Sequence, residues 1–185
     1  MLNATARLLA VDRAGFDALA SAAPAGAGGL TLLPYFDGER TPNLPSATGL
    51  LAGLRSDVCR EQLARAAVEG VVCGMLDALD ALMAHAPVTS VVLTGGGARS
   101  AAVRQVFADL CGVPVSLSTA DEAVATGACV QAAAVALEVD HQEVIRRWGL
   151  GGSTEVPASA SGGRDTAAAV RGAYAAVRDR QYPPA

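Results

Sequence analysis

Three consecutive glycines, Gly95, Gly96 and Gly97, carry the strongest chemical signal in the sequence. They follow an apolar, mostly β-branched run at 91–94 and precede an amphipathic segment that begins near Ser100, which predicts a strand, a tight turn and a helix N-terminus. Glycines let a ligand approach the backbone closely and adopt positive φ without penalty. The free N–H groups and dipole of a helix N-terminus favour an anion. The stretch predicts a phosphate or nucleotide site; the alternative is a tight turn without a ligand.

The chain has no lysine, and its 14 basic residues are all arginines. A Walker A loop and the nucleotide site of a protein kinase both need a lysine on the phosphates, so these two classes are excluded. Gly95 and Gly97 match the first two glycines of the dinucleotide-binding pattern G-x-G-x-x-G, but Ser100 occupies the third position. A Rossmann-type NAD-dependent oxidoreductase is therefore an alternative with a partial match.

A long segment rich in proline and glycine, from Pro34 to about Asp57, contains a second group of candidate site residues. Asp37, Glu39 and Arg40 lie there beside two aromatic residues. Loops of this length are usually functional or disordered. We expect an ordered site loop; the alternative is a surface loop whose charges pair with one another.

Composition limits the partners and the chemistry. The 185 residues are 51% apolar with a net charge of −4 at pH 7, which argues against nucleic acid as a partner. Neither a secretion signal nor a membrane span is recognisable, so we expect a cytoplasmic protein that binds no membrane. The two histidines belong to no ligand cluster and the four cysteines form no C-x-x-C pair. No metal site is therefore predicted, and the cysteines are expected to be buried free thiols.

Hydrophobic periodicity predicts helices alternating with short strands. We expect helices at 4–23, 58–85, 99–111, 121–137 and 164–180, strands at 30–33, 88–94 and 113–117, and a loop at 149–163. Gly70 and Gly74 in the longest helix would each cost roughly 1 kcal/mol relative to alanine, so we expect close backbone packing there. The order of elements is typical of an α/β layered domain, in which ligands lie beyond the carboxyl ends of the strands, where the three glycines would be.

Several short motifs, taken in order along the chain, together resemble one protein family. They are L-P-Y-F-D-G-E-R-T-P at 33–42, G-L at 53–54, R-A-A-V-E-G-V at 65–71, the glycine stretch at 94–100, A-D at 108–109, G-V-P-V at 112–115 and the small-residue helix from 121 to 128. The set resembles the C-terminal domain of the FGGY carbohydrate kinases, and within them the xylulokinases. It covers about residues 30–137.

The resemblance implies an actin-like ATPase, or ribonuclease-H-like, domain with a central mixed, largely parallel sheet flanked by helices. It also implies that Gly95, Gly96 and Gly97 contact the phosphates and ribose of ATP or ADP, with Ser100 as a ribose or adenine neighbour. On this basis we divide the chain into a helical lead-in (1–29), the nucleotide-side domain (30–148), and a loop and final helix packed on the same domain (149–185).

The intact two-domain enzyme is expected to phosphorylate D-xylulose, or a related ketose or polyol, with ATP and Mg²⁺. In the family the N-terminal domain holds most of the sugar site and the catalytic aspartate, and neither is found in these residues. We therefore assign no catalytic residue and expect the chain alone to be inactive. The alternative is a non-catalytic nucleotide-binding or regulatory domain from a truncated kinase gene. A domain built to face a partner should expose apolar surface, so we also expect self-association, for example as a homodimer.

Overall fold

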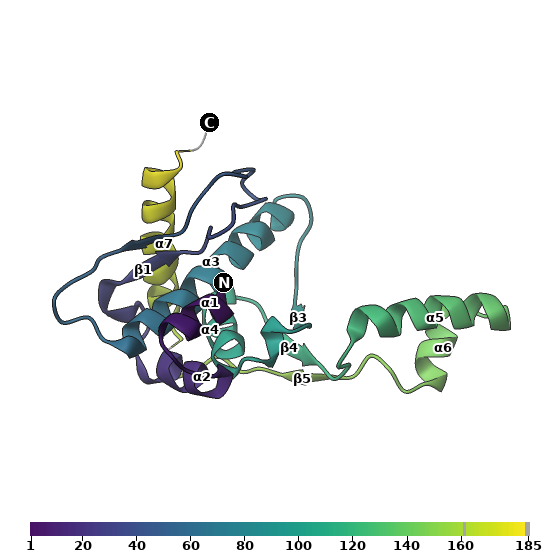
Figure 1. Ribbon diagram of the computed structural model, residues 1–185. Helices are drawn as coiled ribbons and strands as arrows, with labels where there is room; N and C mark the ends of the chain where they lie inside the picture. The colour runs from purple at the N-terminus through teal and green to yellow at the C-terminus, as the bar shows by residue number, and fades with distance from the viewer. Residues whose placement is uncertain (161, 184–185) are drawn as a thin grey trace.

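The computed structural model describes residues 1–160 and 162–183, which form helices around two small sheets (Figure 1). The helices are α1 (Leu2–Leu8), α2 (Arg13–Ala22), α3 (Arg60–Met83), α4 (Ala101–Cys111), α5 (Ala123–Leu137), α6 (His141–Arg147) and α7 (Arg164–Gln181), with short 3₁₀ helices η1 (Ala27–Gly29) and η2 (Gly97–Arg99). The strands are β1 (Thr31–Leu33), β2 (Leu50–Ala52), β3 (Val91–Leu93), β4 (Val115–Ser118) and β5 (Ser153–Glu155). Helices α5 and α6 form an arm that projects from the main body.

Helix α3 lies at the centre of the main body and packs against α1, α2, α4, α7 and β1. Gly70 permits the approach to β1, because a Cβ at this position would lie 2.1 Å from the backbone oxygen of Leu32. At Gly74 the nearest atom to a Cβ would be the Tyr174 hydroxyl at 3.4 Å, so the constraint there is weaker. The predicted close backbone packing is confirmed at Gly70, whereas the neighbour of Gly74 is a side chain at ordinary contact distance.

The two sheets are small and only one contains a parallel pair. Strands β1 and β2 are antiparallel, while the second sheet has the order β3–β4–β5. In it β3 is parallel to β4, with Val91 opposite Val115, and β5 is antiparallel to β4. A mixed sheet is thus present, although the strands of the described residues are not largely parallel. The prediction of a loop throughout 149–163 is wrong at β5. This strand forms by pairing with β4, which is distant in the sequence, and no local sequence pattern indicates such a pairing.

The prediction of one helix at 4–23 is also wrong, because α1 and α2 are separate. Ala10 adopts a left-handed conformation (φ 53°) between them. Asp12 then caps α2 by accepting a hydrogen bond from the Gly15 amide at 2.8 Å. Phe16 and Ala20 of α2 are buried in the main core together with residues of α3. The first helices are therefore part of the body of the domain.

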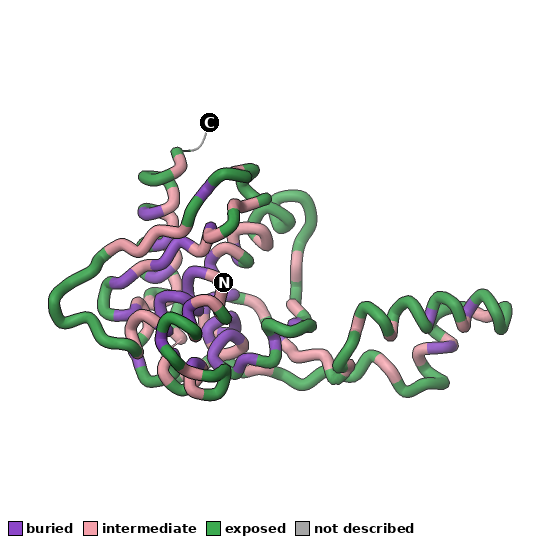
Figure 2. Tube along the Cα trace, in the orientation of Figure 1, coloured by how far each residue is buried: buried purple, intermediate pink, exposed green. Residues whose placement is uncertain are grey.

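The α5–α6 arm has a small core of its own. Val130, Ala134 and Val144 form a buried cluster separate from the main core. Figure 2 shows that most of the rest of α5 is exposed, and Val124 and Val135 are 88% and 79% exposed. A helix that is apolar on all sides is normally buried. Because α5 is largely exposed, it presents an apolar surface that nothing in the described structure covers. Among the described residues no single helix is long and apolar enough to cross a membrane. Helices α5 and α6 taken together have the length and composition of a membrane span, but the chain bends by 110° between them.

The prediction of buried thiols is correct for two cysteines and wrong for two. Cys73 and Cys111 are buried, whereas Cys59 and Cys129 are exposed. Cys59 is the N-cap of α3, where the loop meets the helix, and Cys129 lies on the arm. Burial raises the pKa of the Cys73 thiol to about 12, so this side chain stays neutral at physiological pH.

Candidate functional site

The glycine turn, residues Gly95–Gly97, lies just beyond the carboxyl end of β3, where the sequence predicted it. Gly95 has φ 83°, a left-handed conformation that favours glycine. The chain then enters η2, in which the Ala98 side chain is buried, and Ser100 is the N-cap of α4. The predicted sequence of strand, glycine turn and helix N-terminus is therefore confirmed.

The turn is open to solvent on the side where side chains would project. A Cβ placed on Gly95, Gly96 or Gly97 would meet no atom of the described residues within 4 Å. Gly96 also has an ordinary right-handed conformation, with φ −62° and ψ −35°. Within the part of the chain that the structure describes, no acceptor is found for the backbone N–H groups of these three residues. Internal packing therefore does not explain the second and third glycines, and three amides are free for an external acceptor.

The N-terminus of α4 is occupied by a carboxylate of the chain itself. The Ser100 hydroxyl donates to Asp17 Oδ1 at 2.6 Å and accepts from the Val103 amide at 3.1 Å, while Asp17 Oδ2 accepts from the Ala101 amide at 2.8 Å. Ser100 is only 6% exposed. The positive end of the helix dipole is thus already satisfied, and an external anion would meet the amides of the turn rather than those of α4.

A cavity of about 690 Å³ opens beside the glycine turn between α1, α2 and α3. Its lining residues are Met1, Leu2, Asn3, Ala6, Arg7, Val11, Arg13, Phe16, Asp17, Val71, Gly96, Gly97 and Ser100. Six of these thirteen are apolar and two are glycines, and the charged ones are Asp17, Arg7 and Arg13. A guanidinium nitrogen of Arg13 lies 3.5 Å from the carbonyl oxygen of Gly96, which places this charge at the edge of the turn. The volume is within the ordinary range for a small-molecule site.

Acidic residues near the turn are engaged in pairs. The exposed Glu122, the N-cap of α5, forms an ion pair with Arg99 of η2 at 3.2 Å. Asp17 is held by Ser100 and Ala101. Within the described ranges, no group of three or more histidine, cysteine, aspartate or glutamate side chains is arranged to hold a metal ion.

The predicted site loop is ordered by its own hydrogen bonds. Glu39 pairs with Leu44 through both backbone groups, and its side-chain oxygen accepts from the amides of Arg40 and Thr41 at 2.7 and 3.2 Å. Asp37 and Arg40 are exposed. The carboxylate of Glu39 therefore shapes the loop, while Asp37 and Arg40 face solvent.

The structure does not bring this loop into the cavity beside the glycine turn. None of Asp37, Glu39 and Arg40 lines that cavity, whereas Gly96, Gly97 and Ser100 do. The loop is instead bonded to Tyr182, the C-cap of α7, whose hydroxyl accepts from the amide of Thr48 and donates to its carbonyl. The ring of Tyr182 also lies 5.7 Å from that of Tyr35, measured between centroids.

Sequence reasoning missed the residues of α1 and α2 that form the wall of the cavity. Arg13 and Asp17 reach the turn and α4 from positions 83 or 84 residues earlier in the chain. One local signal was present: Asp12, three residues before Gly15, matches a helix cap and could have separated α2 from the preceding segment. No local sequence pattern, however, indicates a contact between residues 83 or 84 positions apart.

Comparisons with known proteins agree on one family. A model of the FGGY family of carbohydrate kinases, C-terminal domain, matches residues 4–136. The chain is 49% identical over 121 residues to a xylulose kinase from Streptomyces coelicolor, a match that covers 64% of this chain and 25% of the relative.

Solved structures give the same result. The chain resembles xylulose kinase from Bifidobacterium adolescentis with 35% identity and a TM-score of 0.72, covering 96% of this chain and 34% of that protein. It also resembles the ligand-bound xylulose kinase from Lactobacillus acidophilus with 25% identity and a TM-score of 0.85, covering 97% of this chain and 37% of that one. The predicted actin-like α/β fold is confirmed by these matches. The chain spans about a quarter of the curated relative's length and about a third of each solved protein.

Proposed function

Because the chain belongs to the FGGY family of carbohydrate kinases, with its C-terminal domain at residues 4–136, we propose that it is the nucleotide-side part of a xylulose kinase. The complete reaction would be in-line transfer of the γ-phosphoryl group of ATP to a hydroxyl of D-xylulose. The observation that carries the proposal is the open glycine turn with free amides at the rim of a cavity of about 690 Å³. Catalysis of this kind depends mainly on positioning and charge neutralisation.

The cavity offers suitable surfaces for the parts of a nucleotide. Phe16, Val71 and Met1 provide an apolar wall for a purine base. The free N–H groups of the glycine turn can donate to ribose or phosphate oxygens, and Arg13 places a positive charge beside them. In this arrangement Ser100 acts by fixing the turn through Asp17 rather than by offering its own hydroxyl.

Magnesium does not fit the described residues of this chain. The acids beside the turn are already engaged, Asp17 by Ser100 and Ala101 and Glu122 by Arg99. We propose that Mg²⁺ arrives with the nucleotide and is held by groups outside this chain. The base that deprotonates the sugar, and most of the sugar contacts, would likewise come from the part of the relatives that this chain does not span.

The exposed α5–α6 arm supports the proposal that this chain functions together with the part of the kinase that it does not span. Val124, Val135 and Leu137 of α5 are each more than half exposed, at 88%, 79% and 54%. An uncovered apolar helix of this kind is expected to be buried by a partner surface. We propose that the rest of the kinase covers it and that the chain self-associates when that part is absent. The location proposed is the cytoplasm, where ATP and sugar substrates are available.

A titration of the isotope-labelled chain with MgATP, followed by amide chemical shifts, tests the nucleotide site. We expect shifts at Gly95–Gly97, at Asn3 and at Phe16, with weaker binding of NADH than of ATP. Shifts confined to other residues would contradict the proposed site. Preferential binding of NADH would instead favour the oxidoreductase alternative.

A further inference from the structure

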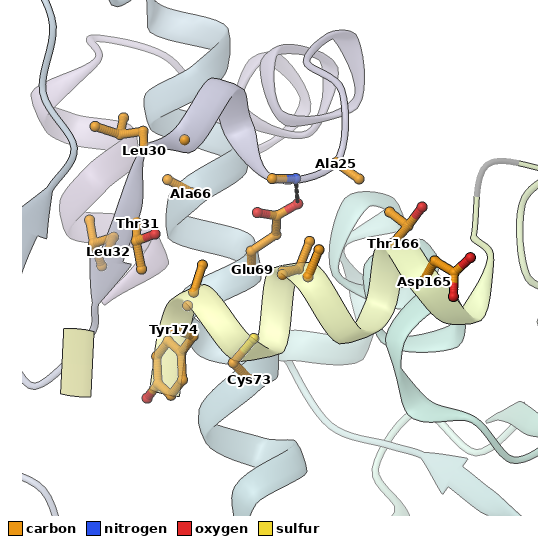
Figure 3. A pocket seen from close by; sticks show the side chains of 16 residues that line it. Ala25, Leu30, Thr31, Leu32, Ala66, Glu69, Cys73, Asp165, Thr166 and Tyr174 are labelled. Carbon is orange, nitrogen blue, oxygen red and sulfur yellow. Dashed lines mark hydrogen bonds between the residues drawn. The ribbon is translucent and has the colours of Figure 1, made fainter. Parts of the chain in front are cut away.

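A second cavity, of about 520 Å³, lies between α3, α7 and β1, and shares no lining residue with the cavity beside the glycine turn (Figure 3). Its lining residues are Ala25, Gly26, Gly29, Leu30, Thr31, Leu32, Ala66, Glu69, Gly70, Cys73, Asp165, Thr166, Ala169, Val170, Ala173 and Tyr174. The proposed nucleotide chemistry does not use any of them. The volume lies within the ordinary range for a small-molecule site.

Small side chains create this space. Ala66 and Gly70 of α3 and Ala169 and Ala173 of α7 all line it, so at these four positions no large side chain fills the space beside the two helices. The walls are mostly apolar, and an apolar body of a ligand would therefore be favoured inside.

One buried carboxylate enters the cavity. Glu69 is 5% exposed, and its Oε1 accepts from Arg65 Nε at 2.7 Å and from the Gly26 amide at 2.9 Å. Oε2 accepts no hydrogen bond from any residue that the structure describes. Figure 3 shows this second oxygen pointing away from the Gly26 bond, toward the side of the cavity where Ala66 and Leu30 lie. The cavity thus contains a fixed acceptor without a partner.

The other polar groups favour a positively charged donor. Asp165 is exposed and is the second carboxylate of the lining, and none of the described arginines or histidines lines this cavity. Thr31, Thr166 and Tyr174 add neutral hydroxyls, of which that of Tyr174 is buried and has no hydrogen-bond partner among the described residues. Cys73 stays a neutral thiol because burial raises its pKa to about 12. Arg65 pairs with Glu69 from outside the lining, and its Nε is already bonded to Oε1.

We propose that this cavity is a binding site for a small apolar amine, whose ammonium group donates to Glu69 Oε2 and whose hydrocarbon body lies between α3 and α7. An alcohol can make the same hydrogen bond without the charge attraction. A carboxylate would be repelled by the two acids and would find only neutral hydroxyls as donors. The site should therefore prefer the amine to the alcohol and the alcohol to the acid. This inference is independent of the proposed kinase function.

The test uses the full chain and three probes of similar shape: 2-phenylethylamine, 2-phenylethanol and 3-phenylpropionate. Dissociation constants are measured by amide chemical shifts at neutral pH. The amine should bind about tenfold or more tightly than the alcohol, as expected for a hydrogen bond to a charged group, and the acid should not bind measurably. Shifts should centre on residues 66–73 and 166–174.

Two variants complete the test. Glu69→Gln should reduce amine binding by about tenfold or more while changing alcohol binding little. Because that variant leaves the buried Arg65 without its partner, Ala169→Leu serves as a second variant that fills the cavity and leaves the ion pair intact. It should abolish binding of the amine. Ala168→Leu is its control, on the same helix but outside the lining.

Equal binding of all three probes, or no binding of the amine, would overturn the proposal. Amine binding that survives Ala169→Leu would overturn it as well, because the ligand would then lie elsewhere. None of these results bears on ATP binding at the glycine turn, so the two proposals fail separately.

Discussion

Alanine substitutions at two adjacent glycines should separate a folding role from a binding role. Gly95 has φ 83°, and an L-residue in this left-handed region costs about 1–2 kcal/mol. Gly96 has φ −62° and ψ −35°, which alanine adopts without strain, and a Cβ there would meet no atom of the described part of the chain within 4 Å. Removing glycine's extra freedom in the unfolded chain then adds about 0.4–1 kcal/mol of stability.

We therefore expect opposite effects on the free energy of unfolding. Gly95→Ala should lower it by about 1–2 kcal/mol. Gly96→Ala should leave it unchanged or raise it by up to about 1 kcal/mol. The new methyl group at position 96, however, enters the space at the rim of the cavity, and one methyl group in a binding pocket changes affinity by about tenfold or more. ATP should thus bind Gly96→Ala about tenfold more weakly although this variant is at least as stable.

Urea unfolding followed by circular dichroism gives the stabilities, and ATP titration gives the affinities. Gly127→Ala, a change within α5 where a Cβ also meets no atom within 4 Å, is the matched control and should retain ATP binding. The reasoning would be refuted if Gly96→Ala lost more than about 1 kcal/mol of stability, the scale on which an internal clash would be felt. It would equally be refuted if this variant bound ATP as tightly as the unmodified chain.

Three further predictions follow from particular contacts. Asp17→Ala should lower the free energy of unfolding by roughly 2–3 kcal/mol, because the Ser100 hydroxyl and the Ala101 amide lose a charged acceptor, whereas Asp17→Asn should lose about half as much in the same urea titration. Iodoacetamide should modify Cys59 and Cys129 in the folded chain and all four cysteines only in denaturant, and intact mass distinguishes two adducts from four. Replacing Val124 and Val135 together by glutamate should reduce self-association in sedimentation velocity; an unmodified chain that sediments as a monomer would contradict the role given to the arm.

Elements with a local cause could be predicted from the sequence. The apolar run before three glycines and the serine after them predicted the turn and the start of α4, and Gly112 ends α4 in the left-handed conformation typical of a C-terminal cap. The length of α3 followed from the spacing of its apolar residues. In each of these cases the deciding interactions join residues that are close together in the sequence.

Contacts between distant segments could not be predicted. Asp17 reaches α4 across 83 or 84 residues, and β5 pairs with β4 across about 37 residues, from Ser116 opposite Glu155 to Ser118 opposite Ser153. The sequence pattern of α5 showed small and apolar residues, but not that most of them are exposed. The candidate site was therefore predicted as a glycine turn, while its wall in α1 and α2 emerged only from the structure.

Reconstitution of sugar phosphorylation tests the central claim most directly. The chain would be mixed with the Streptomyces coelicolor xylulose kinase from which the matching region has been removed, and ATP-dependent phosphorylation of D-xylulose would be measured. That kinase's own excised region serves as the positive control. We predict activity in the mixture, none with either part alone, and a weaker response to ATP with Gly96→Ala. Restoration by the control region but not by this chain would contradict the account and would favour a domain that binds nucleotide without catalysing transfer.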